Sequence, residues 1–176
     1  MRFQSAPELR TLRLRLRPYE LNDFSHFADL YASSRSRFAD GPVSRATAWA
    51  WFAAGAGRWA LVGYGAWAIE RLEDGASVGV VSLNHPITPN EERELGWLLW
   101  QPFEGHGYAS EAANTARQFA FETLGWDSLV SYIHKENALS IRLAERLSAY
   151  LDAQASAAVT DKDTLVYRHR RTSASD

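Results

Sequence analysis

The sequence predicts an α/β (α+β) fold in which helices pack on a sheet that is antiparallel over several strands. The chain has 176 residues, 46% hydrophobic and 23% charged, which is the size and composition of one globular domain. Period-two alternation at residues 11–17, a hairpin signal at residues 64–83 and an alanine-rich helical segment at residues 109–124 together indicate this fold class. We expect a single domain over residues 1–176, with an ordered core at about 9–170.

The composition excludes several classes of protein. The chain has no cysteine, which excludes disulfides, thiolate metal sites and a cysteine nucleophile and favours the cytosol. With 19 basic and 21 acidic residues the net charge is -2, too little to attract a nucleic acid. No apolar run is long enough for a membrane span, so we expect a cytoplasmic protein without a signal peptide. The histidines lack metal-ligand spacing, so no metal is expected.

The first elements are a strand and two helices. Residues 11–17 read T-L-R-L-R-L-R, so leucines line one face of a strand and arginines the other. The arginine row could bind anions, but a solvated outer face is the favoured interpretation. An apolar stripe with helical spacing predicts a helix over residues 20–31, and Ser44 is an N-cap for a second helix over residues 44–54. The stripe consists of Leu21, Phe24, Phe27 and Leu30.

Strands follow in the middle of the chain. Residues 64–71 and 77–83 are joined through Asp74-Gly75, a pair that supplies the positive φ of a hairpin turn. A loop is expected at residues 86–90 and a further strand at residues 94–100. The seven tryptophans indicate a deep core or an aromatic-lined pocket. Four of them lie in the first half of the chain: Trp49, Trp51, Trp59 and Trp67.

Helices and strands alternate in the second half. Gly125 is the expected C-terminal stop of the alanine-rich helix, and the tail at residues 171–176 is expected to be disordered. The expected elements are the helix at residues 109–124, a strand at 129–133, a helix beginning at Asn137 and a strand at 165–169.

A glycine loop connects the strand at residues 94–100 to the alanine-rich helix, and it reads E-G-H-G-Y-A-S over residues 104–110. Two glycines at a helix start let backbone N–H groups converge on an anion, to which the helix dipole adds about 0.3 to 1 kcal/mol of attraction. The loop therefore predicts a phosphate or pyrophosphate site, with a flexible connection as the alternative. A Walker loop is excluded because its Gly-Lys-Ser/Thr is absent, and a dinucleotide fingerprint would need a glycine in place of Ser110.

Four motifs occur in a fixed order. They are T-L-R-L-R-L-R-P from Thr11, E-L-G-W from Glu94, E-G-H-G-Y-A-S-E-A from Glu104 and E-N-A-L-S-I-R-L-A-E-R-L from Glu136. Together they resemble the GNAT superfamily of acetyl-CoA-dependent N-acetyltransferases, most closely its ribosomal-protein-alanine acetyltransferase (RimJ/RimL-like) group. The resemblance implies a mixed, mostly antiparallel sheet of about six or seven strands, flanked by about four helices. Its fourth and fifth strands, here residues 94–100 and 129–133, would splay apart around the pantetheine arm.

The resemblance also implies which residues bind acetyl-CoA. Backbone N–H groups of the glycine loop would hold the pyrophosphate, and those near the end of the fourth strand would bind the thioester oxygen. Asn137 would contact the pantetheine arm, serve as a plain helix N-cap, or do both. Two departures from the family pattern stand out: Pro102 lies one place late, and Glu104 stands where the family has Arg or Gln. The implied set is Leu98, Leu99, Trp100, Glu104, Gly105, His106, Gly107, Tyr108, Ala109, Ser110 and Asn137.

The implied catalytic groups are fewer. Many family members protonate the leaving thiolate with a tyrosine that this chain lacks, so Ser140 is the candidate acid, unless it only strengthens the helix start. Glu94 is a candidate base or a solvated carboxylate beside Arg93, and His134 and Glu136 are its rivals. A weak base suits an α-amine, whose pKa is about 7.7 to 8.0, better than a lysine at about 10.4.

We therefore expect an N-acetyltransferase that moves acetyl from acetyl-CoA to a primary amine by direct attack in a ternary complex. The amine would be a protein N-terminal α-amine or belong to a small molecule, sorted by the first two helices and the aromatic region at residues 49–67. The alternative is a non-catalytic acyl-CoA-binding sensor or interaction module with a degenerate site. A homodimer is compatible with the sequence, whereas nucleic-acid and membrane partners are not expected.

Overall fold

The computed structural model describes residues 4–85 and 92–171. The expected loop at residues 86–90, and residues 172–176 of the expected tail, lie outside the described residues. Within the described ranges a single sheet has eight strands in the order β1-β2-β3-β4-β5-β6-β8-β7, against the six or seven expected. All neighbouring strands are antiparallel except β5 and β6, which confirms a mixed, mostly antiparallel sheet.

Most of the predicted elements are present, with shifted ends. The strands are β1 (Leu9–Arg10), β2 (Leu14–Arg17), β3 (Ala66–Arg71), β4 (Ser77–Asn84), β5 (Glu94–Leu99), β6 (Val130–His134), β7 (Tyr150–Leu151) and β8 (Thr164–Arg168). The α-helices are α1 (Asp23–Ala32), α2 (Arg45–Val62), α3 (Tyr108–Gln118), α4 (Ala138–Arg146) and α5 (Ala153–Ala158). Shorter helical turns are η1 (Ser34–Phe38), η2 (Gln101–Phe103) and the π-helical η3 (Phe119–Thr123) that continues α3. The sequence missed β1, β7 and α5, which are too short to show a periodic pattern.

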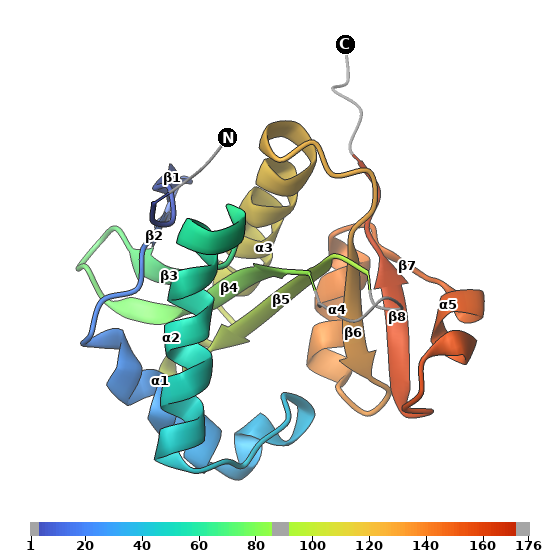
Figure 1. The fold of residues 1–176 in the computed structure, drawn as a ribbon, viewed down its shortest axis with the longest axis horizontal. Coiled ribbons are helices and arrows are strands. Elements are labelled where there is room, and N and C mark those ends of the chain that lie inside the picture. The colour runs from blue at the N-terminus through green and yellow to red at the C-terminus, as the bar shows by residue number, and fades with distance from the viewer. Residues whose placement is uncertain (1–3, 86–91, 172–176) are drawn as a thin grey trace.

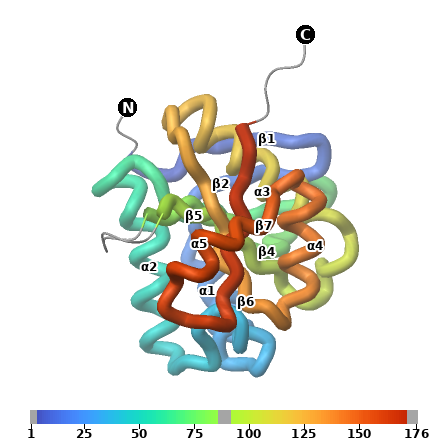
Figure 2. The backbone as a smooth tube through the Cα atoms, turned by 90° about the vertical axis from the view of Figure 1, so that its right-hand side faces the viewer, coloured from blue at the N-terminus to red at the C-terminus, as the bar shows by residue number. Residues whose placement is uncertain are grey.

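Helices cover both faces of the sheet. In Figure 1, α1 and α2 lie in front of the strands of the N-terminal half, and α3 and α4 lie behind the sheet. The perpendicular view in Figure 2 again places α1 and α2 on one side and α3 and α4 on the other. The main core lies between the sheet and α3, and a smaller cluster fills the space under α1 and α2. The tryptophans divide accordingly: Trp59 and Trp67 are in the main core, whereas Trp49 and Trp51 are 46% and 37% exposed.

The strand predicted over residues 11–17 is shorter in the structure, where it is β2. It begins at Leu14 because a turn precedes it, in which the Thr11 side chain accepts a hydrogen bond from the Leu14 N–H at 2.9 Å. The prediction that Leu12 faces the core is therefore wrong, since this side chain is 91% exposed. The expected solvated arginine face is also wrong at Arg17, which is buried and paired with Asp23 of α1 and Glu70 of β3.

The two helices on the front face differ from prediction at their ends. The α1 stripe is correct except for Leu21, which precedes the helix and is 73% exposed. Ser44 is confirmed as the α2 N-cap, with its hydroxyl accepting the Thr47 N–H at 3.1 Å. The helix runs to Val62, eight residues beyond the predicted end, through two glycines of low helix propensity. A Cβ at one of these glycines, Gly55, would lie 3.2 Å from the Cβ of Ala66. The absence of a side chain there lets the helix pack closely on β3.

Candidate active site

The centre of the candidate site is a gap between two parallel strands. β5 and β6 pair at one position, Glu94 with Val130, whereas β4 and β5 pair at six. The Ser131 hydroxyl donates to the Leu95 carbonyl at 2.6 Å, directly beyond that pair. From there the two strands diverge toward their C-terminal ends, as Figure 1 shows. The expected splay of the fourth and fifth long strands is thereby confirmed.

One edge of β5 is turned toward this gap. The Trp100 N–H donates to the Val78 carbonyl of β4 at 3.0 Å. Because the N–H and C=O groups of successive strand residues point to opposite sides, Leu98 also faces β4, and Trp97 and Leu99 face the gap. Among the three expected oxyanion donors, Leu99 is therefore the one directed toward the gap.

The glycine loop lies beyond the end of β5, at the mouth of the gap. Gly105 and Gly107 have φ angles of +80° and +81°, a left-handed conformation that favours glycine. The first bond of α3 runs from the Glu111 N–H to the Gly107 carbonyl at 3.1 Å. The N–H groups of Tyr108, Ala109 and Ser110 precede this bond, so they have no acceptor within the helix. Such a cluster of donors can bind an anion.

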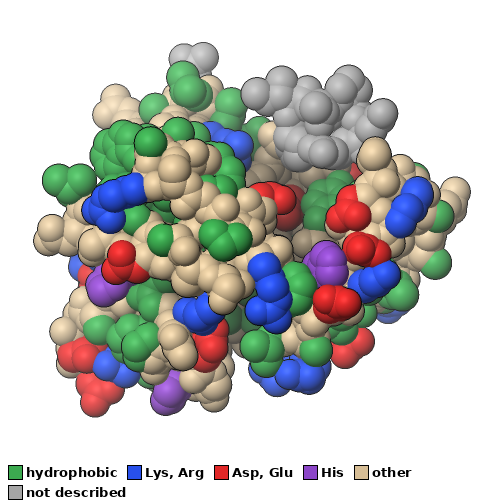
Figure 3. Space-filling model, turned by 90° about the horizontal axis from the view of Figure 1, so that it is seen from below, with side chains coloured by type: hydrophobic (Ala, Val, Ile, Leu, Met, Phe, Trp, Pro, Cys, Tyr) green, Lys and Arg blue, Asp and Glu red, His purple; other side chains and the backbone are tan. Residues whose placement is uncertain are grey.

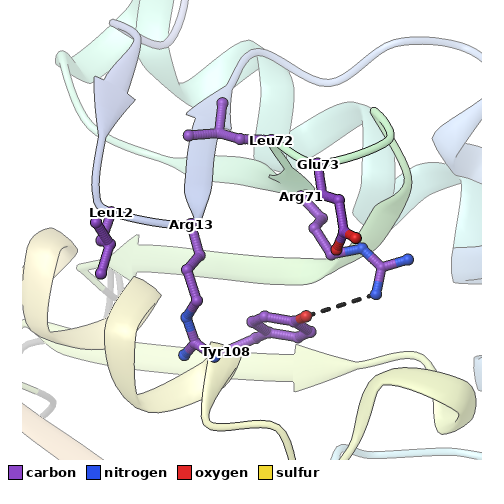
Figure 4. Close-up of a pocket in the computed structure, with 6 residues that line it drawn as sticks. All are labelled: Leu12, Arg13, Arg71, Leu72, Glu73 and Tyr108. Carbon is purple, nitrogen blue, oxygen red and sulfur yellow. Dashed lines mark hydrogen bonds between the residues drawn. The ribbon is translucent and has the colours of Figure 1, made fainter.

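Arginines from four separate parts of the chain surround the loop. Arg13 donates to the His106 carbonyl at 3.0 Å, and Arg146 of α4 donates to the Ser110 hydroxyl at 3.2 Å. Arg71 donates to the Tyr108 hydroxyl at 3.5 Å, and Arg35 of η1 forms an ion pair with Glu104. Figure 4 shows Arg13 and Arg71 on two sides of the Tyr108 ring, in an open pocket of about 310 Å³. Carboxylates pair with three of these arginines, Arg13 with Glu111, Arg71 with Asp74 and Arg35 with Glu104, so the positive charge around the loop is partly offset.

Asn137 and Ser140 lie together at the start of α4. The Asn137 side chain accepts the Ser140 N–H at 3.2 Å, which confirms the predicted N-cap. Both side chains are half-buried. Their contacts to a pantetheine arm or a thiolate stay predictions.

The candidate bases lie at opposite ends of the gap. Glu94 stands at its closed end, beside the single β5–β6 pair. His134 ends β6, four residues beyond Val130, which corresponds to roughly 13 Å along the strand. The His134 ring stacks on Phe38, with the ring centroids 4.9 Å apart. Its neighbour Glu136 is exposed and donates its backbone N–H to His134 Nδ1 at 3.2 Å. Glu94 and His134 therefore do not both contact the same amine directly.

A polar network holds Glu94. Asn84 Nδ2 donates to Glu94 Oε2 at 3.4 Å and to the Ser82 hydroxyl at 3.2 Å, while Arg58 of α2 donates to Asn84 Oδ1 at 2.5 Å. Arg93 forms an ion pair with Asp127, at 3.1 Å. Sequence reasoning missed Asn84 and Arg58, which come from other elements and show no local motif.

Glu94 faces the layer of α1 and α2. Leu98 and Trp100 pack in the cluster under these helices. Every second residue of a strand points to the same face of the sheet, so Glu94 and Gly96 lie on that face as well. Burial raises the pKa of Tyr31 in this layer to about 12, and the charges of Asp40 and Glu94 act in the same direction. The carboxylate is thus directed toward the side opposite α3 and α4.

Residues 4–85 and 92–171 contain no group of three or more His, Cys, Asp or Glu side chains that could hold a metal ion. In the same ranges no helix is both long and apolar enough to cross a bilayer.

The diverging strands and the glycine loop define a class of acyl-transferring enzyme. Residues 13–149 match the acetyltransferase (GNAT) domain family, and the chain belongs to this family. Like the other members, it is an acetyltransferase, and members of the family use acetyl-CoA.

Solved structures agree with this assignment. An acetyltransferase from Agrobacterium tumefaciens str. C58 is 41% identical, with a TM-score of 0.88 over 95% of this chain and 96% of that chain. A GNAT-family acetyltransferase from Bacillus anthracis is 17% identical, with a TM-score of 0.73 over 92% and 96% of the two chains. RimL, a ribosomal L7/L12 alpha-N-protein acetyltransferase solved with coenzyme A, is also 17% identical, with a TM-score of 0.73 over 93% and 97%. The last two share the fold.

Proposed function

We propose that this acetyltransferase transfers acetyl from acetyl-CoA directly to a primary amine, with both substrates bound together and no covalent enzyme intermediate. The observation that supports this most is the gap between β5 and β6, which runs from the Glu94–Val130 pair to the start of α3. An extended arm with amide groups can pair with the β5 edge at Trp97 and Leu99, as an added strand would.

The cosubstrate site consists of backbone donors and two side chains. The N–H groups of residues 105–110 bind the pyrophosphate, and Arg146 adds positive charge beside Ser110. Asn137 caps α4 with its carbonyl oxygen, which leaves its amide Nδ2 to donate to the pantetheine arm.

Acetyl-CoA supplies a thioester, whose carbonyl carbon the amine attacks. The Leu99 N–H stabilises the oxyanion that forms there, because a fixed donor in a water-poor gap needs no reorganisation. Glu94, held by Asn84, is the proposed base; because it stands five residues before Leu99 on β5, roughly 17 Å along the strand, the proton that the amine loses as its N–C bond forms reaches it through intervening water. Ser140 protonates the sulfur as the C–S bond breaks, a modest task because a thiolate whose thiol pKa is about 8.5 leaves readily near neutrality.

The acceptor enters from the face of α1 and α2. Gly96 leaves that face of β5 open between Glu94 and Leu98, and a Cβ there would meet the Ser82 hydroxyl at 3.1 Å. A single carboxylate is a weak base, which suits an α-amine better than a lysine. The name of the neighbour RimL likewise specifies an alpha-N-protein substrate. A protein N-terminal α-amine is therefore the acceptor we propose first, with a small-molecule amine second.

Thermal melting with and without acetyl-CoA tests the cosubstrate site. A ligand at 100 times its Kd stabilises the fold by about 2.7 kcal/mol, so the melting temperature should rise with acetyl-CoA and not with NAD. Thiol release should then be followed with a panel of N-terminal peptides, lysine peptides and small amines. A shift without turnover for any amine would favour the acyl-CoA sensor, and no shift at millimolar acetyl-CoA would contradict the proposed site.

A further inference from the structure

Glu104 is the most unfavourable residue in the proposed pyrophosphate loop. It stands first in the loop, where the family pattern has Arg or Gln. A carboxylate within a few ångströms of phosphate charges repels them and lowers their affinity, even at the dielectric constant of water. A functional cosubstrate site therefore requires that this charge be offset by another residue.

Arg35 is in contact with that carboxylate. Its guanidinium forms an ion pair with Glu104 Oε1, and the two residues are 69 positions apart in the chain. The side chains of Arg35 and Glu104 are 30% and 44% exposed, so the pair adds little to folding stability. Partial exposure also leaves the guanidinium able to reach a ligand, because an arginine has five N–H donors and the pair uses only part of them.

The turn that presents Arg35 is fixed by partly buried hydrogen bonds. The Ser33 hydroxyl accepts the Arg35 N–H at 3.3 Å, which caps η1. Ser36 is fully buried and its hydroxyl donates to the Ser33 carbonyl at 2.8 Å. Gly41 packs against Ser36 so closely that a Cβ would come within 1.9 Å of the Ser36 hydroxyl. Arg35 is thus held over the loop by a turn with little freedom.

Arg35 also lines an open pocket of about 250 Å³ between α1 and η2. The other charged or titratable groups around this pocket are Asp29 and His26, both on α1. Trp100 and Gln101, at the end of β5, complete the wall next to the loop. The guanidinium therefore lies where the α1–η1 segment meets the mouth of the gap between β5 and β6.

We propose that Arg35 is a cosubstrate-binding residue that supplies, from η1, the positive charge that position 104 lacks. In the ion pair, the Arg35 guanidinium offsets the charge of the Glu104 carboxylate, and the carboxylate holds the guanidinium beside the phosphate site. This inference rests on the proposed function, because it needs the pyrophosphate of acetyl-CoA at the loop.

The test is a set of variants whose affinity for acetyl-CoA is measured by titration calorimetry at several salt concentrations. Arg35→Ala should raise the Kd roughly tenfold and make its salt dependence shallower, with little change in melting temperature. Arg37→Ala is the matched control, since Arg37 lies on the same turn but packs over the Phe38 ring at 4.4 Å. Its Kd should stay within about twofold of the unmodified protein.

Two double variants separate a charge role from a structural one. R35A/E104Q should recover part of the lost affinity, and R35A/E104R most of it, because arginine then stands at the family position. An unchanged Kd in R35A, or no recovery in R35A/E104R, would overturn the role of Arg35. Failure of the unmodified protein to bind acetyl-CoA would instead overturn the cosubstrate site, and the Arg35 inference with it.

Discussion

At the scale of single residues, Gly107 is the most constrained position of the candidate site. Its φ of +81° is unfavourable for any residue with a Cβ, and strongly so for a β-branched one. We predict that Gly107→Val abolishes acetyl-CoA binding in calorimetry while circular dichroism shows a folded protein. A changed backbone conformation at residue 107 would displace the N–H groups of the glycine loop, so that they no longer bind the phosphates.

Gly75 provides a matched control for this variant. It has a similar φ of +73° in the β3–β4 turn, where a Cβ would meet nothing within 4 Å. Gly75→Val should therefore lose a similar stability, about 1–2 kcal/mol, and keep its affinity for acetyl-CoA. Equal loss of binding in both variants would show that strain, and not the loop, controls affinity.

The two candidate bases are separated by substitution with glutamine. We predict that Glu94→Gln lowers kcat by about 100-fold or more without changing the Kd of acetyl-CoA, because only proton removal from the amine is lost. His134→Gln should change kcat by less than about threefold, because in this proposal the proton of the amine goes to Glu94. The reverse order of effects, measured by thiol release at saturating amine, would assign the base to His134.

His169 makes stability depend on pH. Burial, aided by the charge of Arg117, lowers its pKa from 6.5 to about 4. The unfolded chain therefore takes up a proton below pH 6.5 that the folded protein rejects, so stability falls between pH 6.5 and about 4. The difference corresponds to about 3 kcal/mol at most.

Urea unfolding at pH 7.5 and pH 5 measures this effect. His169→Gln keeps a donor and an acceptor near Ser131, whose hydroxyl lies 2.9 Å from His169 Nε2, but cannot titrate. The loss of stability between the two pH values should be smaller in this variant than in the unmodified protein. Equal losses would mean that carboxylates alone account for the acid sensitivity.

At the scale of elements, the start of α4 has two separable roles. Asn137→Asp keeps an oxygen that can cap the Ser140 N–H but removes the amide donor proposed for the pantetheine arm. We predict unchanged stability with weakened acetyl-CoA binding in Asn137→Asp, and a loss of about 1 kcal/mol as well in Asn137→Ala. Calorimetry measures the affinity and urea unfolding the stability. If the aspartate variant binds acetyl-CoA normally, Asn137 serves only as the N-cap of α4.

Elements set by local chemistry were predictable from the sequence. The Asp74-Gly75 hairpin, the Ser44 cap and the alanine-rich α3 each follow from neighbouring residues, and the structure contains all three. The splay followed from four ordered motifs and a family resemblance. In each case the signal lies within a few residues or in the order of segments.

Contacts between distant elements were not predictable in the same way. The pairs Arg35–Glu104 and Arg58–Asn84 join residues 69 and 26 positions apart, and no periodic pattern records which side chains meet. The burial of Arg17 was missed for the same reason, because its partners Asp23 and Glu70 lie on two other elements. Polar side chains in one sequence do not reveal whether water or another side chain surrounds them.

At the scale of the whole molecule, charge is distributed without a dominant sign. Figure 3 shows acidic and basic side chains interspersed over the face seen from below. The net charge of -2 agrees with this distribution. Attraction of the phosphates must therefore come from local groups at the loop, because the protein as a whole supplies no positive field.

The two halves of the sheet meet through few main-chain bonds at the point where acetyl-CoA is proposed to bind. β5 and β6 share one residue pair, and a side chain adds a further link between the halves, since the Ser131 hydroxyl of β6 donates to the Leu95 carbonyl of β5 at 2.6 Å. A ligand that pairs with the β5 edge would add bonds where the sheet has fewest. A bound ligand should therefore protect the backbone N–H groups around β5 from exchange, and not those of the whole sheet.

Hydrogen exchange with mass spectrometry checks this expectation. We predict that acetyl-CoA slows exchange at early times in peptides covering Trp97, Leu99 and the start of α3, whose N–H groups point toward the gap or lack helical acceptors. The β3–β4 hairpin, already paired along its length, should change little. NAD serves as the control ligand and should protect neither region. Protection spread evenly over β2, β3 and β4, with none at β5, would mean that acetyl-CoA binds outside the gap.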